Sequence, residues 1–240
     1  MIQDKVIQTF NTFAADYEHS VDHSALYNCE YERPTMMECV PKDLPNKNVL
    51  DAGCAAGWYA QQFVNLGAHV TAIDVSPEMI EATKRRVGDT CTVMCADLSA
   101  KLPFEDDTFD FIVSSLTLHY IQDWDTTFQE FSRVLKKDGT FLFSVHHPMM
   151  DQQLSPSDVY FNCELVKDTW KKGGKSVDVY YYRRPLQVII NDTIKHFTFS
   201  RMVEPTPTEN FKKQNEESYQ KLMKTPAFLI IEAKNDKGRA

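Results

Sequence analysis

Apolar runs alternate with helical patterns between about residues 48 and 147 of this 240-residue chain. Short apolar runs followed by segments of period near 3.6 are typical of a parallel sheet with helices on both faces. The helix expected after the fourth run has one buried stripe, formed by Trp124, Phe128, Phe131 and Leu135. It should end at 137–139, before a strand over 140–145. The pattern therefore predicts an α/β, doubly wound fold.

The pattern differs on both sides of this region. Residues 1–45 have a partly amphipathic helical pattern, which predicts a helical N-terminal cap. Residues 149–182 contain two strand-like runs, which we interpret as a hairpin inserted after the fifth strand. The later elements are a helix near 185–196 and strands over 198–203 and 227–233. We expect a single domain over residues 1–240, with seven strands in its main sheet.

A small-residue loop follows the first strand. The apolar run at Val49 reaches Asp51 and breaks into Gly53–Gly57 before the next helical pattern. Glycines let backbone N–H groups approach a ligand, and a helix N-terminus favours anionic groups. The spacing G-x-A-x-G is not the dinucleotide fingerprint G-x-G-x-x-G. Asp74 ends the next apolar run about 20 residues downstream, where a ribose-binding carboxylate belongs. These features predict a nucleotide-cofactor site.

Five motifs follow one another over roughly residues 49–120. They are D-A-G-C-A-A-G, T-A-I-D-V-S-P-E-M-I, C-A-D-L, L-P-F-E-D-D-T-F-D and S-S-L-T-L-H-Y. In this order the chain resembles the class I S-adenosylmethionine (SAM)-dependent methyltransferases, most closely their small-molecule, type 11 (UbiE-like) branch. The resemblance implies SAM as cofactor and S-adenosylhomocysteine (SAH) as product. It also implies a Rossmann-like sheet whose last two strands are antiparallel, one inserted between its neighbours.

The resemblance assigns cofactor-binding roles to individual residues. Asp74 would accept hydrogen bonds from both ribose hydroxyls, Asp97 would accept one from the adenine amine, and Asp51 would orient a water or the ammonium group, or only brace the loop. Ala55 stands where the family usually has Gly, which an ordinary φ would permit. Met79 and Tyr17 could instead be packing residues of their helices. The full expected set is Tyr17, Asp51, Gly53, Cys54, Ala55, Gly57, Asp74, Val75, Met79, Ala96, Asp97, Leu98, Ser114 and Ser115.

Histidines are the candidate catalytic groups. Methyl transfer from a sulfonium needs mainly alignment and desolvation, and a base only if the acceptor arrives protonated. His119 lies just past the fourth strand, beside the expected methyl position, where a structural role is equally open. His146 and His147 end the fifth strand and face opposite sides, and we favour His147 as the one in the cleft. His19 and His23 have a metal-pair spacing without a third ligand, so we expect no metal.

The insertion over 149–182 is rich in aromatic residues. In the family this segment is commonly a lid over the methyl acceptor. An aromatic lid would suit an acceptor with an apolar or planar surface and would exclude water, although part of it could simply pack onto the sheet. Arg33 could hold a substrate carboxylate or phosphate, or make a surface salt bridge. The candidate acceptor contacts are Tyr31, Arg33, Tyr160, Trp170 and Tyr181.

Composition narrows the possible partners. A net charge of −8 and a pI near 5.4 argue against nucleic acid. No apolar run approaches the roughly 20 residues of a membrane span, and no signal-peptide pattern opens the chain, so we expect no membrane partner. Six scattered cysteines favour reduced thiols in the cytoplasm. The oligomeric state is not indicated.

Three functional classes remain. The leading hypothesis is SAM-dependent methyl transfer to O, N, C or S of an unidentified small molecule. A SAM-binding protein without catalysis, serving in an assembly, is an alternative because methyl transfer requires no universal catalytic residue. A nicotinamide-dependent oxidoreductase is a weaker alternative, since the chain lacks G-x-G-x-x-G and has no Tyr followed four residues later by Lys.

Overall fold

The computed structural model describes residues 2–21, 24–172 and 175–237. Its main sheet has seven strands in the order β3-β2-β1-β4-β5-β9-β8. Strands β1 to β5 pair in parallel, and β9 lies between β5 and β8, antiparallel to both. This confirms the expected sheet with an inserted last strand. The strands are β1 Asn48–Ala52, β2 His69–Asp74, β3 Cys91–Cys95, β4 Phe109–Ser115, β5 Leu135–His146, β8 Thr198–Val203 and β9 Phe228–Lys234.

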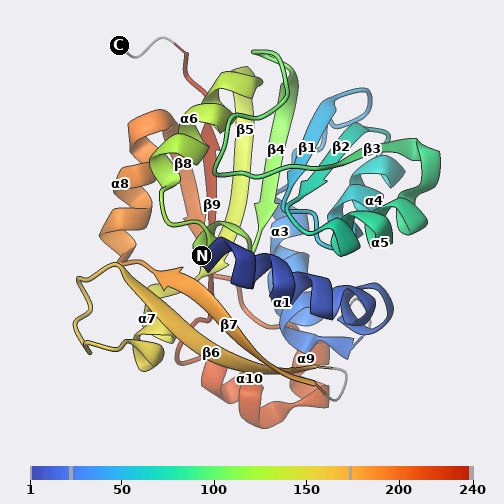
Figure 1. The fold of residues 1–240 in the computed structure, drawn as a ribbon. Helices are drawn as coiled ribbons and strands as arrows, with labels where there is room; N and C mark the ends of the chain where they lie inside the picture. Colours follow the sequence, from blue (N-terminus) through green and yellow to red (C-terminus); the bar gives the residue numbers. More distant parts are fainter. Residues whose placement is uncertain (1, 22–23, 173–174, 238–240) are drawn as a thin grey trace.

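Helices flank this sheet, and the remaining elements gather near one end of it (Figure 1). The flanking helices are α3 Arg33–Cys39, α4 Trp58–Asn65, α5 Pro77–Val87, α6 Trp124–Val134 and α8 Leu186–His196. The others are α1 Ile2–Asp16, the π-helical turns η1 Tyr17–Val21 and η2 Asn28–Glu32, α7 Pro148–Asp151, α9 Glu209–Gln214 and α10 Glu216–Leu222. Short 3₁₀ turns are η3 Gly88–Thr90, η4 Leu118–Tyr120 and η5 Gln152–Leu154. A separate hairpin comprises β6 Glu164–Lys172 and β7 Lys175–Arg183.

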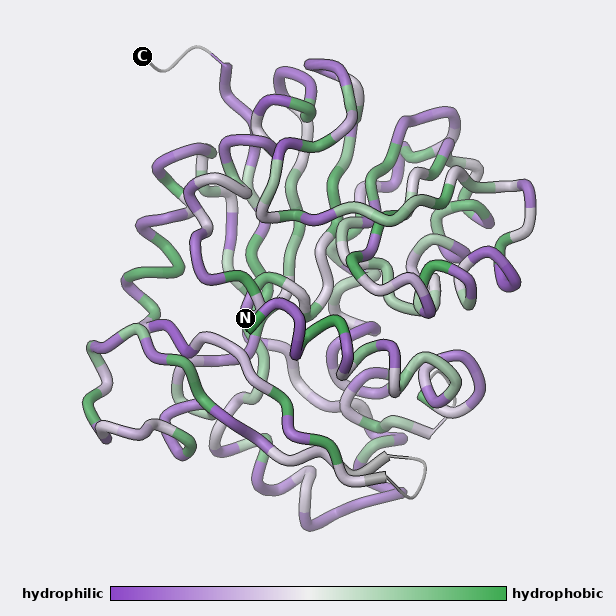
Figure 2. Tube along the Cα trace, viewed as in Figure 1, coloured by the Kyte–Doolittle hydropathy of each residue, from purple (hydrophilic) through white to green (hydrophobic). Residues whose placement is uncertain are grey.

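Both faces of the sheet are buried, because successive strand residues point to opposite sides. In β1, Val49 packs in the cluster that contains Phe63 of α4, whereas Leu50 packs in the cluster that contains Phe128 of α6. Strands covered on both faces are apolar along nearly their whole length. Figure 2 accordingly shows the central strands as the most hydrophobic part of the trace. The apolar runs of the sequence are explained by this double burial.

Local signals set some element boundaries and not others. Ser76 caps α5 by accepting the N–H of Met79 at 3.2 Å, and Pro77 takes the first position, as predicted. The predicted end of α6 at 137–139 was wrong. The helix ends at Val134, and Leu135 already pairs with Phe109 of β4. A residue that fits both a helical stripe and a strand is assigned by this long-range pairing.

The N-terminal helix and the hairpin cover the carboxyl ends of the parallel strands (Figure 1). Phe13 of α1 is fully buried against Val166, Val179 and Tyr181 of the hairpin. Tyr31 and Phe211 form another small core beside Phe228 at the start of β9. These contacts enclose the space at the strand ends. Among the described residues, no helix is long and apolar enough to cross a membrane.

Candidate cofactor and acceptor site

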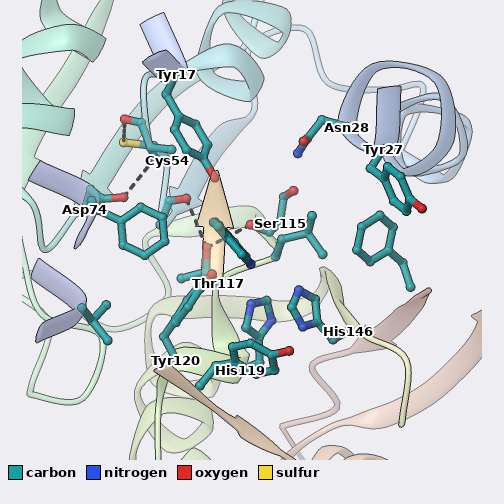
Figure 3. A pocket seen from close by; sticks show the side chains of 18 of the residues that line it. Tyr17, Tyr27, Asn28, Cys54, Asp74, Ser115, Thr117, His119, Tyr120 and His146 are labelled. Atoms are coloured by element: carbon teal, nitrogen blue, oxygen red, sulfur yellow. Dashed lines mark hydrogen bonds between the residues drawn. The ribbon is translucent and has the colours of Figure 1, made fainter. Parts of the chain in front are cut away.

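One cavity of about 580 Å³ lies at the carboxyl ends of the parallel strands. Figure 3 shows Asp74 and Cys54 on one side of it and His119 and His146 on another, with Ser115 between them. Thirteen of the residues predicted from the sequence line this cavity. They are Tyr17, Arg33, Gly53, Cys54, Ala55, Asp74, Val75, Asp97, Leu98, Ser115, His119, Trp170 and Tyr181.

The loop after β1 requires glycine at two positions. The N–H groups of Gly53 and Cys54 both donate to the Ile73 carbonyl, at 2.8 and 2.9 Å, and fix the loop against β2. Gly53 has a φ of 85°, and a Cβ there would lie 2.3 Å from the Thr117 side chain. Gly57 has a φ of 77° and would place a Cβ 2.7 Å from Thr83. The backbone therefore forms a close-fitting cradle along one wall of the cavity, although Gly57 itself does not line it.

Ala55 has a left-handed conformation, with a φ of 47°. The condition under which a methyl group is readily tolerated at this position, an ordinary φ, is therefore not met. Its N–H donates to Asp74 Oδ2 at 3.0 Å, and its carbonyl accepts from the Thr83 hydroxyl at 2.7 Å. The left-handed region costs an L-residue about 1–2 kcal/mol. These two bonds hold Ala55 in a conformation that glycine would adopt more readily.

Asp74 ends β2 with both carboxylate oxygens directed at backbone amides. Oδ2 accepts the Ala55 N–H, and Oδ1 accepts the Ser76 N–H at 2.9 Å. Burial raises the pKa of this carboxyl group, and the amide bonds oppose that rise. Each oxygen retains acceptor capacity beyond one bond. A rigidly held carboxylate at this edge of the cavity is suited to bind a diol.

Asp51 lies beneath the loop rather than in the cavity wall, and only 1% of its surface is exposed. Burial raises its pKa to about 7, and the charge of Asp74 adds to the rise. Among the described residues, Oδ2 of Asp51 has no hydrogen-bond partner. A buried acceptor left unpaired costs about 1–3 kcal/mol, so this oxygen calls for a water or a ligand group. The position is compatible with orienting a cationic ligand group through the loop.

Asp97, which follows β3, connects the end of that strand to the N-terminal helix α1 by a hydrogen bond. Its Oδ1 accepts the Ser99 N–H at 2.8 Å, and its Oδ2 accepts the side-chain amide of Gln3 in α1. Leu98 and Val75 line the cavity beside it. Ala96 does not line it; its N–H donates to the Asp74 carbonyl at 3.0 Å. This side of the cavity offers a carboxylate next to apolar surface.

Four further predicted contacts are packing or bracing residues outside the cavity wall. Met79 is fully buried beside Ala14, Ala56 and Ala82, so its alternative role in packing holds. The Ser114 hydroxyl is buried and donates to the Ala52 carbonyl at 2.8 Å, which ties β4 to β1. The other two bond to backbone elsewhere: Tyr31 OH accepts the Ala227 N–H at 2.9 Å, and Tyr160 OH accepts the Leu186 N–H at 3.1 Å.

The histidine at the end of β5 that faces the cavity is His146, not the predicted His147. Nδ1 of His147 accepts the Met149 N–H at 3.2 Å and caps α7, while its Nε2 lies 3.0 Å from Glu204. Nδ1 of His146 lies 3.2 Å from Oδ1 of Asp151. The two adjacent histidines point to opposite sides of the strand, as expected, and it is His146 whose ring faces the cavity.

His119 lies against His146, with ring centroids 4.0 Å apart and nearly parallel planes. Both of its ring nitrogens are buried, and neither has a hydrogen-bond partner among the described residues. Burial, followed by the neighbouring His146 and Arg184, holds the pKa of His119 well below its usual range. The imidazole of His119 is therefore neutral at physiological pH.

Glu32 is the buried acid that sequence reasoning missed, although it lies between two residues that it did single out. Its carboxylate accepts hydrogen bonds from the hydroxyls of Ser115 at 2.8 Å, Ser144 at 2.6 Å and Tyr59 at 2.9 Å. Burial raises its pKa. Glu32 thus anchors the N-terminal cap to β4, β5 and α4 directly behind the cavity wall.

Arg33 is buried, with 7% of its surface exposed, so its side chain does not lie at the surface. Its guanidinium lies 4.2 Å from the centre of the Trp58 ring and lines the cavity. As for metals, no group of three or more His, Cys, Asp or Glu residues in the described part of the chain could hold an ion. His23, one of the pair with metal-like spacing, lies outside the described residues.

The strand order, the cradle after β1 and the acid that ends β2 together define the architecture of a class I methyltransferase. The family model for the methyltransferase domain matches residues 50–143. A protein of Listeria monocytogenes assigned as a SAM-dependent methyltransferase superposes with a TM-score of 0.74 at 27% identity, covering 86% of this chain and 97% of that one. A SAM-dependent methyltransferase of Mesorhizobium loti superposes with a TM-score of 0.70 at 24% identity, covering 90% and 100%, and supports the fold.

The sequence relatives do not indicate one substrate. An uncharacterized protein of Haemophilus influenzae is 27% identical over 238 residues, which cover 85% of this chain and 86% of that protein. The malonyl-[acyl-carrier protein] O-methyltransferase of Erwinia billingiae is 38% identical over 98 residues, which cover 41% of this chain and only 38% of that enzyme. The matched domain over residues 50–143 and the superposition over most of the chain support a class I SAM-dependent methyltransferase of the type 11 kind, which implies SAM as the cofactor. The glycine cradle, the rigidly held carboxylate of Asp74 and the unpaired oxygen of Asp51 fit that cofactor.

Proposed function

We propose that the protein transfers the methyl group of SAM to a small-molecule acceptor. The observation that carries this proposal is the continuity of the cavity. The glycine loop and Asp74 line one side of it and His119 and His146 another (Figure 3), and the aromatic residues Trp170 and Tyr181 line the same space. A cofactor and a small acceptor can share such a space, whereas a macromolecule would have to enter a site covered by α1 and the hairpin.

The cofactor end contains groups for each part of SAM. In the proposed mode Asp74 accepts the ribose hydroxyls, Asp97 accepts the adenine amine, and the methionine end lies against the cradle backbone above Asp51. Tyr17 lines the cavity from the N-terminal cap and closes over the cofactor. When bound, SAM supplies an electrophilic methyl group on a cationic sulfonium and leaves as SAH. The residues of the chain contribute alignment and exclusion of water.

The acceptor end suits a ligand with a planar or apolar body. Phe228, Tyr27 and Trp170 all line the cavity, and the Trp170 indole N–H donates to Asp168 at 2.8 Å. In this proposal the β6–β7 hairpin is the lid that admits the acceptor and then excludes water. Arg33, whose guanidinium lies over Trp58 directly after the glycine loop, adds a cation to the cavity and in this proposal holds an acidic substituent of the acceptor. The methylated atom is O, N, C or S.

The proposed partners follow from charge and thiol chemistry. A net charge of −8 disfavours nucleic acid as the acceptor. No disulfide joins cysteines in the described part of the chain, which agrees with a reducing compartment, and we place the protein in the cytoplasm.

A transfer experiment tests this proposal. The purified chain is incubated with SAM carrying a deuterated methyl group and a small-metabolite extract, and labelled products are detected by mass spectrometry. We expect a labelled small molecule, strongly reduced in Trp170→Ala. Tyr160→Phe, which changes a residue outside the cavity, is the matched control and should retain product formation. SAM binding without any labelled small molecule would favour the non-catalytic alternative, and label in added RNA or protein would contradict the acceptor class.

A further inference from the structure

We propose that His146, oriented by Asp151, accepts the proton of the methyl acceptor, which is therefore a hydroxyl, thiol or amine that enters the cavity still protonated. This inference rests on the proposed methyl transfer and names the acceptor chemistry that it serves. It replaces the two histidines that the sequence favoured, because the structure gives neither of them a hydrogen-bonded carboxylate together with access to the cavity.

The geometry around His146 fixes which ring nitrogen carries a proton. Nδ1 lies 3.2 Å from Oδ1 of Asp151, and the Tyr181 hydroxyl donates to the same oxygen at 3.2 Å. An ionised carboxylate can only accept hydrogen bonds, so the neutral ring places its proton on Nδ1. Nε2 then has a lone pair and makes no hydrogen bond to the described residues. The ring lines the cavity, and in this proposal the Nε2 lone pair faces the acceptor there.

The neighbours of His146 support a single positive charge on this ring. Asp151 faces it from α7 and Tyr181 from β7, while Phe228 stacks on it from β9 at 6.0 Å. His119 faces it from η4 at 4.0 Å and is neutral. A second imidazolium at that distance would be repelled, so the proton of the acceptor resides on His146, beside the carboxylate.

The proposed step is balanced in atoms and electrons. Nε2 of His146 takes the proton of the acceptor while the acceptor lone pair forms the bond to the methyl carbon and the carbon–sulfur bond breaks, leaving its electron pair on sulfur. The products are the methylated acceptor, SAH and a His146 imidazolium whose charge Asp151 offsets. Later release of that proton to water restores the neutral ring. General-base assistance of this kind contributes about 10²–10⁴-fold.

The tautomer of His146 can be measured before any acceptor is known. The full chain is labelled with ¹⁵N-histidine, and long-range ¹⁵N–¹H spectra are recorded free and with SAH. The resonances of His146 are those that disappear in His146→Gln. We expect the neutral ring to carry its proton on Nδ1. A proton on Nε2 in both states would overturn the proposal, because that nitrogen could not then accept another.

Turnover provides the second test, using a hydroxyl acceptor from the labelling screen. His146→Gln should lower kcat by about 10²–10⁴-fold while SAH affinity, measured by calorimetry, stays within about twofold. Asp151→Asn should lower kcat less and move its pH profile. His196→Gln, a matched change at the end of α8 and outside the cavity lining, should leave kcat unchanged. An unchanged kcat in His146→Gln, or a larger loss in His147→Gln, would overturn the assignment. Failure of the wild type to bind SAH would instead refute the proposed function.

Discussion

Replacing Asp51 by Asn should make the protein more stable at alkaline pH. The folded chain raises the pKa of this carboxyl from 3.8 to about 7, mainly by burial, so folding favours its neutral form. The stability linked to this group is present below the unfolded pKa and is lost as pH rises toward the folded pKa. A difference of about 3 pKa units corresponds to about 4 kcal/mol at pH 8. An amide of the same shape never ionises and costs about 1–3 kcal/mol to bury unpaired, so a net gain of about 1–3 kcal/mol is expected.

Urea unfolding of wild type and Asp51→Asn at pH 5 and pH 8 measures this effect. The difference between the unfolding free energies of the two proteins at each pH cancels the contribution of every other titrating group. The stability difference should move by about 2–3 kcal/mol in favour of the variant between these pH values. Asp89→Asn, at an exposed position, is the matched control and should show little dependence on pH. A difference that is the same at both pH values would refute the argument, because it would mean that Asp51 has an ordinary pKa in the folded chain.

Three further substitutions test the site at single positions. Gly53→Ala should weaken SAH binding by about 1–3 kcal/mol, since its Cβ would lie 2.3 Å from Thr117; unchanged affinity in calorimetry would count against the cradle. Ala55→Gly should raise the free energy of unfolding by about 0.5–1 kcal/mol, because relief of left-handed strain exceeds the entropy cost of glycine; a loss would show that the methyl group packs usefully. Glu32→Gln should lower the free energy of unfolding by about 1–3 kcal/mol, because an amide NH₂ group replaces a carboxylate oxygen that accepts a hydroxyl hydrogen bond. Glu38→Gln at an exposed position should change this free energy by almost nothing, and equal effects of the two substitutions would contradict the network.

Features that depend on neighbours in the sequence were predicted well. Apolar runs and helical periods are local, so the order of elements and the Ser76 cap could be read directly. Strand ends of a parallel sheet meet at one edge, which explains why Asp74, Asp97 and Ser115 were correctly placed around one space. The end of α6 was missed because Leu135 satisfies both a helical stripe and a strand, and the pairing with Phe109 decides between them.

Features that depend on distant partners were not predictable in this way. Alternation along β5 implies that one of two adjacent histidines faces the cavity, but which one depends on how the pleat meets the neighbouring strands. Glu32 lies 83 positions from Ser115 and 112 from Ser144, so no local pattern reveals their contact. The left-handed turn at Ala55 is held by Asp74 and Thr83, and its identity alone suggested an ordinary backbone.

The central claim is that the cavity binds SAM through the cradle and Asp74. Isothermal titration of the wild-type chain with SAM, SAH and NADH, beside Asp74→Ala, tests it most directly. The account predicts micromolar binding of both sulfur compounds, loss of that binding in Asp74→Ala, and no binding of NADH. Binding of NADH in place of SAM and SAH, or SAH affinity unaffected by Asp74→Ala, would contradict it.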